Sequence, residues 1–370
     1  MSFRDELRRL PLDDLLETAR TATDTAVDRA LAAERPDLFD FAALLSPAAG
    51  ARLEQLAKRS HALTTRRFGR TVQLYAPFYV SNECVEGCTY CSFARENPIR
   101  RRTLTVDEAV DEARLLVDQG FRHLLLVSGE HPRHVPPDYV AEILERLRDD
   151  VPSLSVEVQP QKTEVYRKWV EAGAEGLVVY HETYDREVYA KVHPAGKKKD
   201  YDWRLDTPDR GAEAGMRRIG IGALLGLADW RLEAIHLAAH ARYLARRWWR
   251  ANVTVSFPRL RRAAFAIQAP RPVTDAELAR IVCATRIFDP DLGIILSTRE
   301  TPAFRDGMLA LGITQMSAGS RTEPGGYSAP DATEKQFDIE DGRSPADVAQ
   351  AIRSRGLDPV WKDWESALSG

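Results

Sequence analysis

The chain has 370 residues, of which 44% are hydrophobic and 29% are charged. This length and composition are typical of a folded protein with either one large barrel or two ordinary domains. The formal net charge of −3 gives no basis for a nucleic acid or an anionic membrane as partner. No apolar run reaches membrane-spanning length, and residues 1–8 lack the apolar core of a signal peptide. The four cysteines do not form a disulfide framework, so we expect a cytoplasmic protein.

Residues 1–70 are predicted to form a helical extension. Leucine and alanine recur at helical spacing in two stretches, 12–19 and 53–63, and Pro36 and Pro47 divide the segment. None of these residues indicates chemistry. We expect the extension to pack on the domain that follows it.

From residue 72 onward, short runs rich in Val, Ile and Leu alternate with amphipathic segments of helical length. Eight runs are predicted to be strands: 72–80, 124–127, 154–158, 176–179, 218–221, 252–255, 293–296 and 313–316. A strand followed by a helix, repeated in this way, predicts an α/β protein with a (β/α)8 TIM-type barrel over residues 71–320.

The residues that follow these runs are polar or rich in glycine. They are 81–84, 128–130, 159–161, 181–183, 222–226, 256–259, 297–300 and 317–320. In such a barrel the carboxyl ends of all strands face one rim, where barrel enzymes build their active sites. This ring of polar strand ends predicts an enzyme.

Three of the four cysteines lie directly after the first run. Cys84, Cys88 and Cys91 have the spacing C-x3-C-x2-C, whereas Cys283 lies in an apolar helical stretch and is expected in the core. Three thiolates on one loop hold three irons of a [4Fe-4S] cube and leave the fourth iron open. Half of a zinc site is the alternative, although structural zinc needs a second pair of ligands. The residues alone favour the cluster and leave zinc open.

Three other groups of polar residues have simpler interpretations. His131 and His134 form one pair of histidines, and His236 and His240 form another at i, i+4 spacing. Neither pair completes a metal motif, so surface or packing roles are expected. The run Lys197–Lys199 is expected to be a solvated loop, with a lid over the rim as the alternative.

The cysteine spacing, with Tyr90 before the last cysteine, resembles the signature of radical S-adenosylmethionine (SAM) enzymes. From about residue 70 to the end, the chain is similar to the tyrosine lyase family of thiamin thiazole biosynthesis. The similar blocks occur in the same order at 81–93, 123–131, 157–160, 180–184, 203–210, 219–227, 255–261, 296–301, 315–327 and 360–364.

The resemblance implies a [4Fe-4S] cluster on the three cysteines, with SAM bound to the open iron. Reductive cleavage of SAM would give methionine and a 5′-deoxyadenosyl radical. That radical would start cleavage of the Cα–Cβ bond of L-tyrosine to 2-iminoacetate (dehydroglycine) and p-cresol. Thiazole synthase as a protein partner and a flavodoxin- or ferredoxin-type electron donor are also implied.

Two alternatives stay open at this stage. One is another radical SAM lyase of aromatic amino acids, like the hydrogenase maturases or the tryptophan lyases. No cysteine follows Cys283 to hold a second cluster, and blocks 324–327 and 360–364 look like the thiamin enzyme. The second alternative is a non-catalytic barrel that binds zinc.

The resemblance also implies which residues contact the cofactors. Glu130 would accept a hydrogen bond from the SAM ammonium, Tyr90 would stack near the adenine or the cluster, and glycine at 222 would let the backbone approach the adenine. Ordinary packing is the alternative for Tyr90. The expected SAM-contacting residues are Tyr90, Ser128, Gly129, Glu130, Glu157, Glu182, Gly222 and Leu224.

The substrate carboxylate needs a fixed cation, and Arg299 is the first candidate because its guanidinium binds carboxylates bidentately. Arg259 is the second, with a structural ion pair to Glu157 or Glu182 as its alternative. The remaining candidates are Ser317 and Ser320 as hydroxyl donors to the carboxylate, Tyr79 near the substrate, and Gln159, which contacts either SAM or the substrate.

Residues 321–370 are expected to form a C-terminal segment packed on the barrel. Two tryptophans near its end, Trp361 and Trp364, indicate a tail that docks on the protein.

Overall fold

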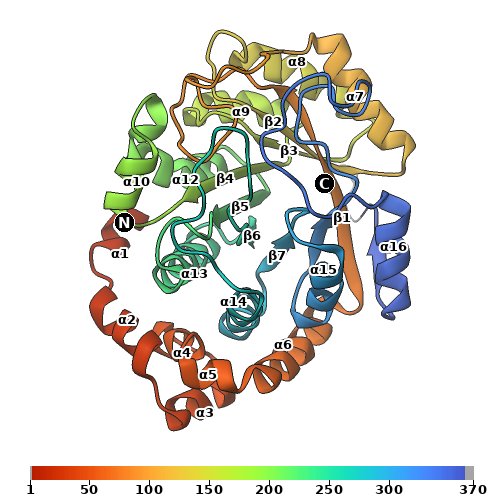
Figure 1. The fold of residues 1–370 in the computed structure, drawn as a ribbon. Coiled ribbons are helices and arrows are strands. Elements are labelled where there is room, and N and C mark those ends of the chain that lie inside the picture. Colours follow the sequence, from red (N-terminus) through yellow and green to blue (C-terminus); the bar gives the residue numbers. More distant parts are fainter. Residues whose placement is uncertain (1, 363–370) are drawn as a thin grey trace.

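A computed structural model describes residues 2–362 and contains a closed barrel of eight parallel strands (Figure 1). The strands are β1 (Thr71–Ser81), β2 (His123–Ser128), β3 (Ser153–Glu157), β4 (Gly176–Glu182), β5 (Arg218–Ala223), β6 (Asn252–Ser256), β7 (Gly293–Leu296) and β8 (Gln315–Ser317). Each pairs in parallel with the next, and β1 pairs with both β2 and β8, which closes the ring. The predicted (β/α)8 fold is confirmed.

Helices between the strands surround the barrel (Figure 1). They are α7 (Val106–Asp118), α8 (Pro137–Leu147), α9 (Thr163–Glu171), α12 (Thr207–Glu213), α13 (Trp230–Arg247), α14 (Asp275–Phe288) and α15 (Pro302–Met308), with the short helix η2 (Leu309–Leu311) after α15. Helix α7 begins with a capping box between Thr105 and Glu108, which satisfies two backbone amides at its start. Cys283 is fully buried on α14, as expected of a core cysteine.

The connection from β4 to α12 carries three additional short elements. They are α10 (Arg186–Val192), η1 (Lys197–Lys199) and α11 (Tyr201–Leu205). This insertion lies at the rim of the barrel, because its residues Lys198 and Arg204 line a cavity there. It therefore supplies side chains to the site that the strand ends alone would not.

The N-terminal residues form six helices that pack mainly against α13 and α14. They are α1 (Phe3–Leu7), α2 (Leu12–Thr21), α3 (Asp24–Ala32), α4 (Leu38–Leu44), α5 (Pro47–Ala51) and α6 (Leu53–Phe68). The ring of Phe3 stacks on that of His240 at 4.0 Å, and the hydroxyl of Tyr184 lies 2.8 Å from His240 Nδ1. His240 is therefore a packing residue, as expected for this pair of histidines.

The chain after β8 returns across the barrel end before it forms α16 (Pro345–Ser354) and a short strand, β9 (Asp358–Val360). This ninth strand was not predicted. It pairs in parallel with residues Thr71–Gln73 of β1, at the edge that β2 leaves open because β2 pairs only from Ala76 onward. Strand β1 is long enough for β9 to pair with its first residues and for β2 to pair with its last ones.

The indole of Trp361 then packs edge-on against the ring of Phe121, with ring centroids 5.1 Å apart. This contact places Trp361 next to Phe121, shortly before β2. Trp364 lies outside the described residues. Within residues 2–362, no helix combines the length and apolar character needed to cross a bilayer.

A buried ion pair holds the returning segment to the barrel. Arg305 on α15 is fully buried and donates to the carboxylate of Asp341 and to the carbonyl of Ser317 at the end of β8. Arg343 donates to Asp341 at 2.7 Å and to Asp306 at 3.0 Å. The segment that crosses the rim is thereby anchored at its far end.

We predict that Asp341→Ala lowers the free energy of unfolding by about 3–5 kcal/mol, because the change leaves a buried guanidinium without its counter-ion. Chemical denaturation of the full chain measures this value. The matched control is Asp338→Ala at an exposed position of the same segment, which should change stability by less than about 0.5 kcal/mol. Equal stability of the two variants would contradict the proposed anchor.

Candidate active site

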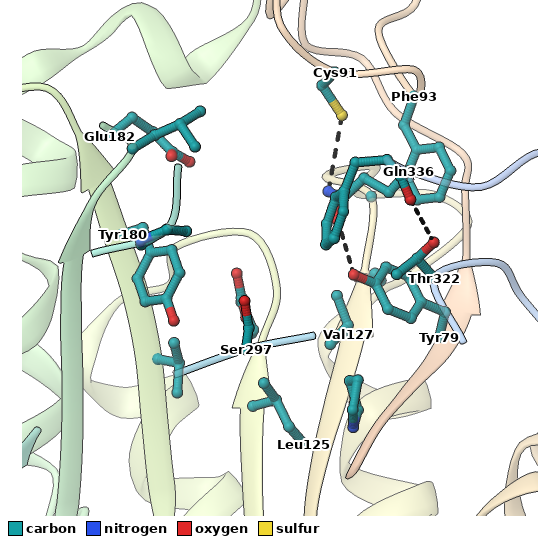
Figure 2. Close-up of a pocket in the computed structure, with 18 of the residues that line it drawn as sticks. Tyr79, Cys91, Phe93, Leu125, Val127, Tyr180, Glu182, Ser297, Thr322 and Gln336 are labelled. Carbon is teal, nitrogen blue, oxygen red and sulfur yellow. Dashed lines mark hydrogen bonds between the residues drawn. The ribbon is translucent and has the colours of Figure 1, made fainter. Parts of the chain in front are cut away.

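A cavity opens at the carboxyl ends of the barrel strands, and every strand contributes to its lining. The contributing residues, which lie on a strand or directly after it, are Tyr79, Ser128, Glu157, Glu182, Leu224, Ser256, Ser297 and Ser317, in the order β1 to β8. Figure 2 shows Tyr180 and Glu182 on one wall, facing Tyr79, Phe93, Cys91 and Gln336 on the other. The polar ring expected from the sequence therefore surrounds one space.

Most of the residues predicted for the site are brought together here. Those that line the cavity are Tyr79, Cys84, Cys88, Tyr90, Cys91, Ser128, Gly129, Glu130, Glu157, Glu182, Leu224, Arg299, Ser317 and Ser320. Arg259, Gln159 and Gly222 are not among them, and each is described below.

The cysteine-bearing loop is held to the end of β1 by polar side chains of its own flanks. Arg101 donates to the carbonyls of Asn82 and Phe93, each at 2.7 Å, and the side chain of Asn82 bonds to the backbone of Arg100 and Arg102. Gly129 lets β2 approach this loop, because a Cβ there would lie 2.3 Å from the carbonyl oxygen of Glu83. The loop is thus built into the rim.

The three thiols are in a setting that disfavours free thiolates. Burial raises the pKa of Cys91 to about 11 and the pKa values of Cys84 and Cys88 to about 12. Deprotonation therefore requires a positive partner such as a metal centre.

One zinc ion with Zn–S bonds of about 2.3 Å would place its sulfur ligands within about 4.6 Å of one another. The sulfurs of Cys84, Cys88 and Cys91 do not all lie within 4.8 Å of one another, so at least one pair is farther apart than two ligands of one zinc ion.

A network of buried charges lies beside the cysteines. Arg204 donates to Glu130 at 2.8 Å and to the carbonyl of Tyr180 at 2.8 Å, and Lys198 donates to Glu182 at 2.8 Å. Burial tends to raise the pKa of Glu182, but Lys198 and Arg204 outweigh it and lower the pKa. The expectation of a solvated lysine run is wrong for Lys198, whose side chain is 9% exposed, because this carboxylate draws it inward.

Backbone geometry contributes to this network. Glu182 adopts a left-handed conformation with φ of 75°, at a point where β4 and β5 change register. A non-glycine residue in this region is strained, and such strain is typical of functional positions.

On the cysteine loop, the carboxylate of Glu86 accepts hydrogen bonds from the amides of Lys197 and Lys198 at 3.0 and 2.8 Å. The lysine-bearing turn is therefore attached to the loop between Cys84 and Cys88.

Glu157 lies deeper in the cavity, at the end of β3. Burial and then the nearby charge of Glu182 raise the pKa of Glu157 to about 7.

Tyr90 lines the same cavity with its ring, while its hydroxyl is 2.7 Å from Nε2 of His193. Since His193 Nδ1 lies 3.0 Å from the carbonyl of Tyr189, that nitrogen carries the proton and Nε2 accepts from Tyr90.

Arg299 is a cation without an anionic partner at the cavity wall. Its guanidinium lies 3.3 Å from the ring centroid of Phe337, and among the described residues it has no ion pair, although the charges of Glu182 and Glu157 act on it. Burial lowers the pKa of Arg299, although it stays a cation at neutral pH. Ser320, which lines the same cavity, has a buried hydroxyl with no hydrogen-bond partner in the described chain. This wall is suited to an anionic ligand.

Arg259 occupies a different place. Its guanidinium donates to Glu300 at 3.0 Å and pairs with Asp275 at 2.7 Å, so neither Glu157 nor Glu182 is its partner. Pro258 and Leu260 face the cavity, and the residue between them points away because side chains alternate along extended backbone. The structure therefore does not support Arg259 as a second carboxylate-binding residue.

Gln159 and Gly222 are also displaced from the main cavity. Gln159 lines a smaller neighbouring cavity that shares Glu130 and Arg204 with the main one. A Cβ on Gly222 would lie 2.7 Å from the ring of Tyr180, so glycine at this position makes room for that ring. It does not bring the backbone to the cavity surface.

His131 and His134 converge with Glu83 near the cysteine loop, with ligand atoms within 4.8 Å of one another. However, Nδ1 of His131 accepts hydrogen bonds from the amides of Arg133 and His134 at 3.3 and 3.4 Å. A neutral imidazole has one lone pair, and the backbone already uses it. The expected structural role fits this geometry better than a metal site.

Sequence reasoning missed several lining residues, which are Glu86, Lys198, Arg204, Gln336 and Phe337. Arg204 lies in block 203–210, whose similarity to the tyrosine lyases was a usable signal. Gln336 and Phe337 had no signal, since they lie in a loop without periodicity or motif.

Comparison with known proteins agrees with these features. Residues 78–238 match the Radical SAM superfamily and residues 256–358 match the Biotin and Thiamin Synthesis associated domain. The chain is 44% identical over 368 residues to the 2-iminoacetate synthase of Escherichia coli (strain K12), which covers 99% of this chain and 98% of that protein.

Among solved structures, the hydrogenase maturase HydG has a TM-score of 0.89 and 32% identity, and covers 95% of this chain and 79% of its own. HydG from Carboxydothermus hydrogenoformans has a TM-score of 0.84, also with 32% identity, and covers 97% of this chain and 82% of its own. Because 44% of the aligned residues are identical over nearly the full length of both proteins, the chain belongs to the 2-iminoacetate synthase family of radical SAM enzymes.

Proposed function

We propose that this protein is a radical SAM tyrosine lyase that cleaves the Cα–Cβ bond of L-tyrosine to 2-iminoacetate and p-cresol for the thiazole part of thiamin. The observation that carries the proposal is one cavity lined both by the three cysteines and by Arg299, which has no ion pair among the described residues, in a chain 44% identical to a 2-iminoacetate synthase. The cysteines suit a redox cofactor and the arginine suits a carboxylate substrate.

The cysteine loop fits a [4Fe-4S] cluster held by Cys84, Cys88 and Cys91. In a cube each sulfur binds a different iron, which agrees with cysteines that are too widely spread for one zinc ion. The orphaned buried hydroxyl of Ser128 and the close approach at Gly129 leave a polar, shaped edge beside the loop for SAM. When bound, the cluster and SAM supply a 5′-deoxyadenosyl radical by one-electron reductive cleavage of SAM.

The network of buried charges is what the protein itself contributes to SAM binding in this proposal. Glu130 offers a carboxylate that can accept from the SAM ammonium, as a charge-assisted hydrogen bond. Arg204 keeps that carboxylate oriented by donating to it at 2.8 Å. Lys198 holds Glu182 in place and lies 5.6 Å from the ring centroid of Tyr90. Each charge is paired before any ligand arrives, so little reorganisation is needed.

Arg299 binds the tyrosine carboxylate in this proposal, with hydroxyl donation from Ser320 and Ser317. The apolar wall for the substrate ring is formed by Tyr79, Phe93, Leu125 and Val127, which pack in one cluster. The C-terminal segment with Phe337 covers the same side, which limits the access of water to a radical reaction.

The alternatives are less well supported. The hydrogenase maturases are relatives, with 32% identity and a longer chain, whereas the synthase matches nearly end to end. No observation favours a tryptophan lyase. A zinc-binding barrel disagrees with the spread of the cysteine sulfurs and leaves Arg299 without a role. Thiazole synthase as partner, a flavodoxin- or ferredoxin-type donor, and a cytoplasmic location stay predictions.

The reaction is tested with the anaerobically reconstituted full chain, tyrosine, SAM and a reductant. We expect roughly four irons and four sulfides per chain, and formation of p-cresol, 5′-deoxyadenosine and glyoxylate from the hydrolysed imine. Iron and acid-labile sulfide analysis measures the cluster content, and chromatography of the product mixture measures the three organic products. Stoichiometric zinc, with no effect of SAM on any EPR signal, would refute the lyase.

Arg299→Ala should weaken the apparent affinity for tyrosine by about 30-fold or more, equivalent to about 2 kcal/mol, because a buried charge-assisted pair is lost. Iron content and reductive SAM cleavage without tyrosine should be retained. Arg262→Ala, at an exposed arginine of the rim, is the matched control and should leave KM unchanged. Unchanged tyrosine affinity in Arg299→Ala would place the carboxylate elsewhere.

Gly129→Ala should reduce the iron bound per chain to less than half, since the new methyl group would collide with the backbone at Glu83 and displace the cysteine loop. Iron and acid-labile sulfide analysis measures the loss. Gly307→Ala on α15 is the control, because no atom lies within 4 Å of its added Cβ. Full iron content in Gly129→Ala would show that the loop does not need this approach.

A further inference from the structure

Gln336 contacts both the cysteine loop and Tyr79, which belongs to the proposed wall for the substrate ring. Its side-chain Nε2 lies 3.8 Å from Sγ of Cys91, and the hydroxyl of Tyr79 lies 2.8 Å from its Oε1. Figure 2 draws both hydrogen bonds, with Gln336 between the cysteine above and the tyrosine below. The residue comes from the loop after β8, remote in sequence from both partners.

The backbone of Gln336 is fixed on two sides. Its carbonyl accepts from the hydroxyl of Ser92 at 3.0 Å, directly after Cys91, and its amide donates to the carbonyl of Thr322 at 2.9 Å. The hydroxyl of Thr322 in turn donates to the carbonyl of Phe337 at 3.0 Å. A glutamine side chain normally has considerable rotamer freedom, and these bonds restrict where it can reach.

The chemistry of the partners sets the orientation of the amide. A cysteine sulfur bound to iron has no proton and only accepts hydrogen bonds, so the NH2 group of Gln336 must face Cys91. The amide oxygen then faces Tyr79, whose hydroxyl must donate to it. The lone pairs of the Tyr79 oxygen are left for a donor in the cavity.

We infer that Gln336 is a positioning residue that stabilises the reduced cluster through Cys91 and holds Tyr79 as a hydrogen-bond acceptor toward the substrate. An N–H donor to a ligating sulfur stabilises the more negative, reduced state and raises the reduction potential. The bond from Tyr79 to the amide oxygen polarises the amide and strengthens its N–H donor. The inference rests on the proposed function, because it requires a cluster on the cysteines.

The test is an EPR-monitored redox titration of the reconstituted full chain without tyrosine or SAM. Gln336→Leu removes both hydrogen bonds and should shift the midpoint potential to a more negative value. Gln336→Glu should shift it further in the same direction, since an ionised carboxylate cannot donate to sulfur and its negative charge disfavours the more negative, reduced cluster. Gln350→Leu, at an exposed position of α16, is the matched control and should keep the wild-type potential.

Tyr79→Phe serves as a second variant in case Gln336→Leu fails to retain its cluster. It removes only the phenolic donor, so a smaller shift in the same negative direction is expected. A potential equal to wild type in a cluster-loaded Gln336→Leu, or in Tyr79→Phe if the former loses its cluster, overturns the inference. A wild-type chain that takes up no cluster would instead overturn the proposed function, so the two failures are distinct.

Discussion

Closure of the barrel through β1 is the constraint on which the site depends. Residues 76–81 of β1 pair with β2, and residues 73–75 pair with β8, so the first and last strands meet at the same element. The cysteine loop leaves from the end of this strand, and the segment that carries Gln336 follows β8. Pairing therefore places these two segments next to each other before any side chain of the site makes contact.

The charged residues of the cavity form ion pairs because they are buried. Glu130, Glu182, Lys198 and Arg204 lie where water has little access, and an isolated charge would be costly there. They offset one another in two short ion pairs, and Glu86 attaches the lysine-bearing turn to the cysteine loop. Arg299 is the exception, because its guanidinium rests on an aromatic ring without a carboxylate. A cation at a cavity wall that is not held in an ion pair is what a carboxylate ligand would need.

The returning C-terminal segment links stability to the site. The buried pair of Arg305 with Asp341 fixes the end of the segment to α15 and β8, while Gln336 and Phe337 reach the cavity a few residues earlier. A loop without regular structure is thereby held over the rim by side-chain and backbone bonds at both ends. Gln336 also contacts Cys91, a candidate iron ligand, and Phe337 contacts Arg299.

The sequence by itself determined the barrel and much of the site. Hydrophobic runs at strand length, separated by amphipathic helices, follow from local periodicity, and polar residues at their ends must meet at one rim. Cysteine spacing is also a local property. Only the tertiary structure decided that Lys198 turns inward, that Arg259 turns away toward Glu300, and that Gln336 reaches Cys91. These outcomes depend on which charges and hydrogen-bonding groups become neighbours after closure, and distances of this kind are not encoded in the spacing of residues along one chain segment.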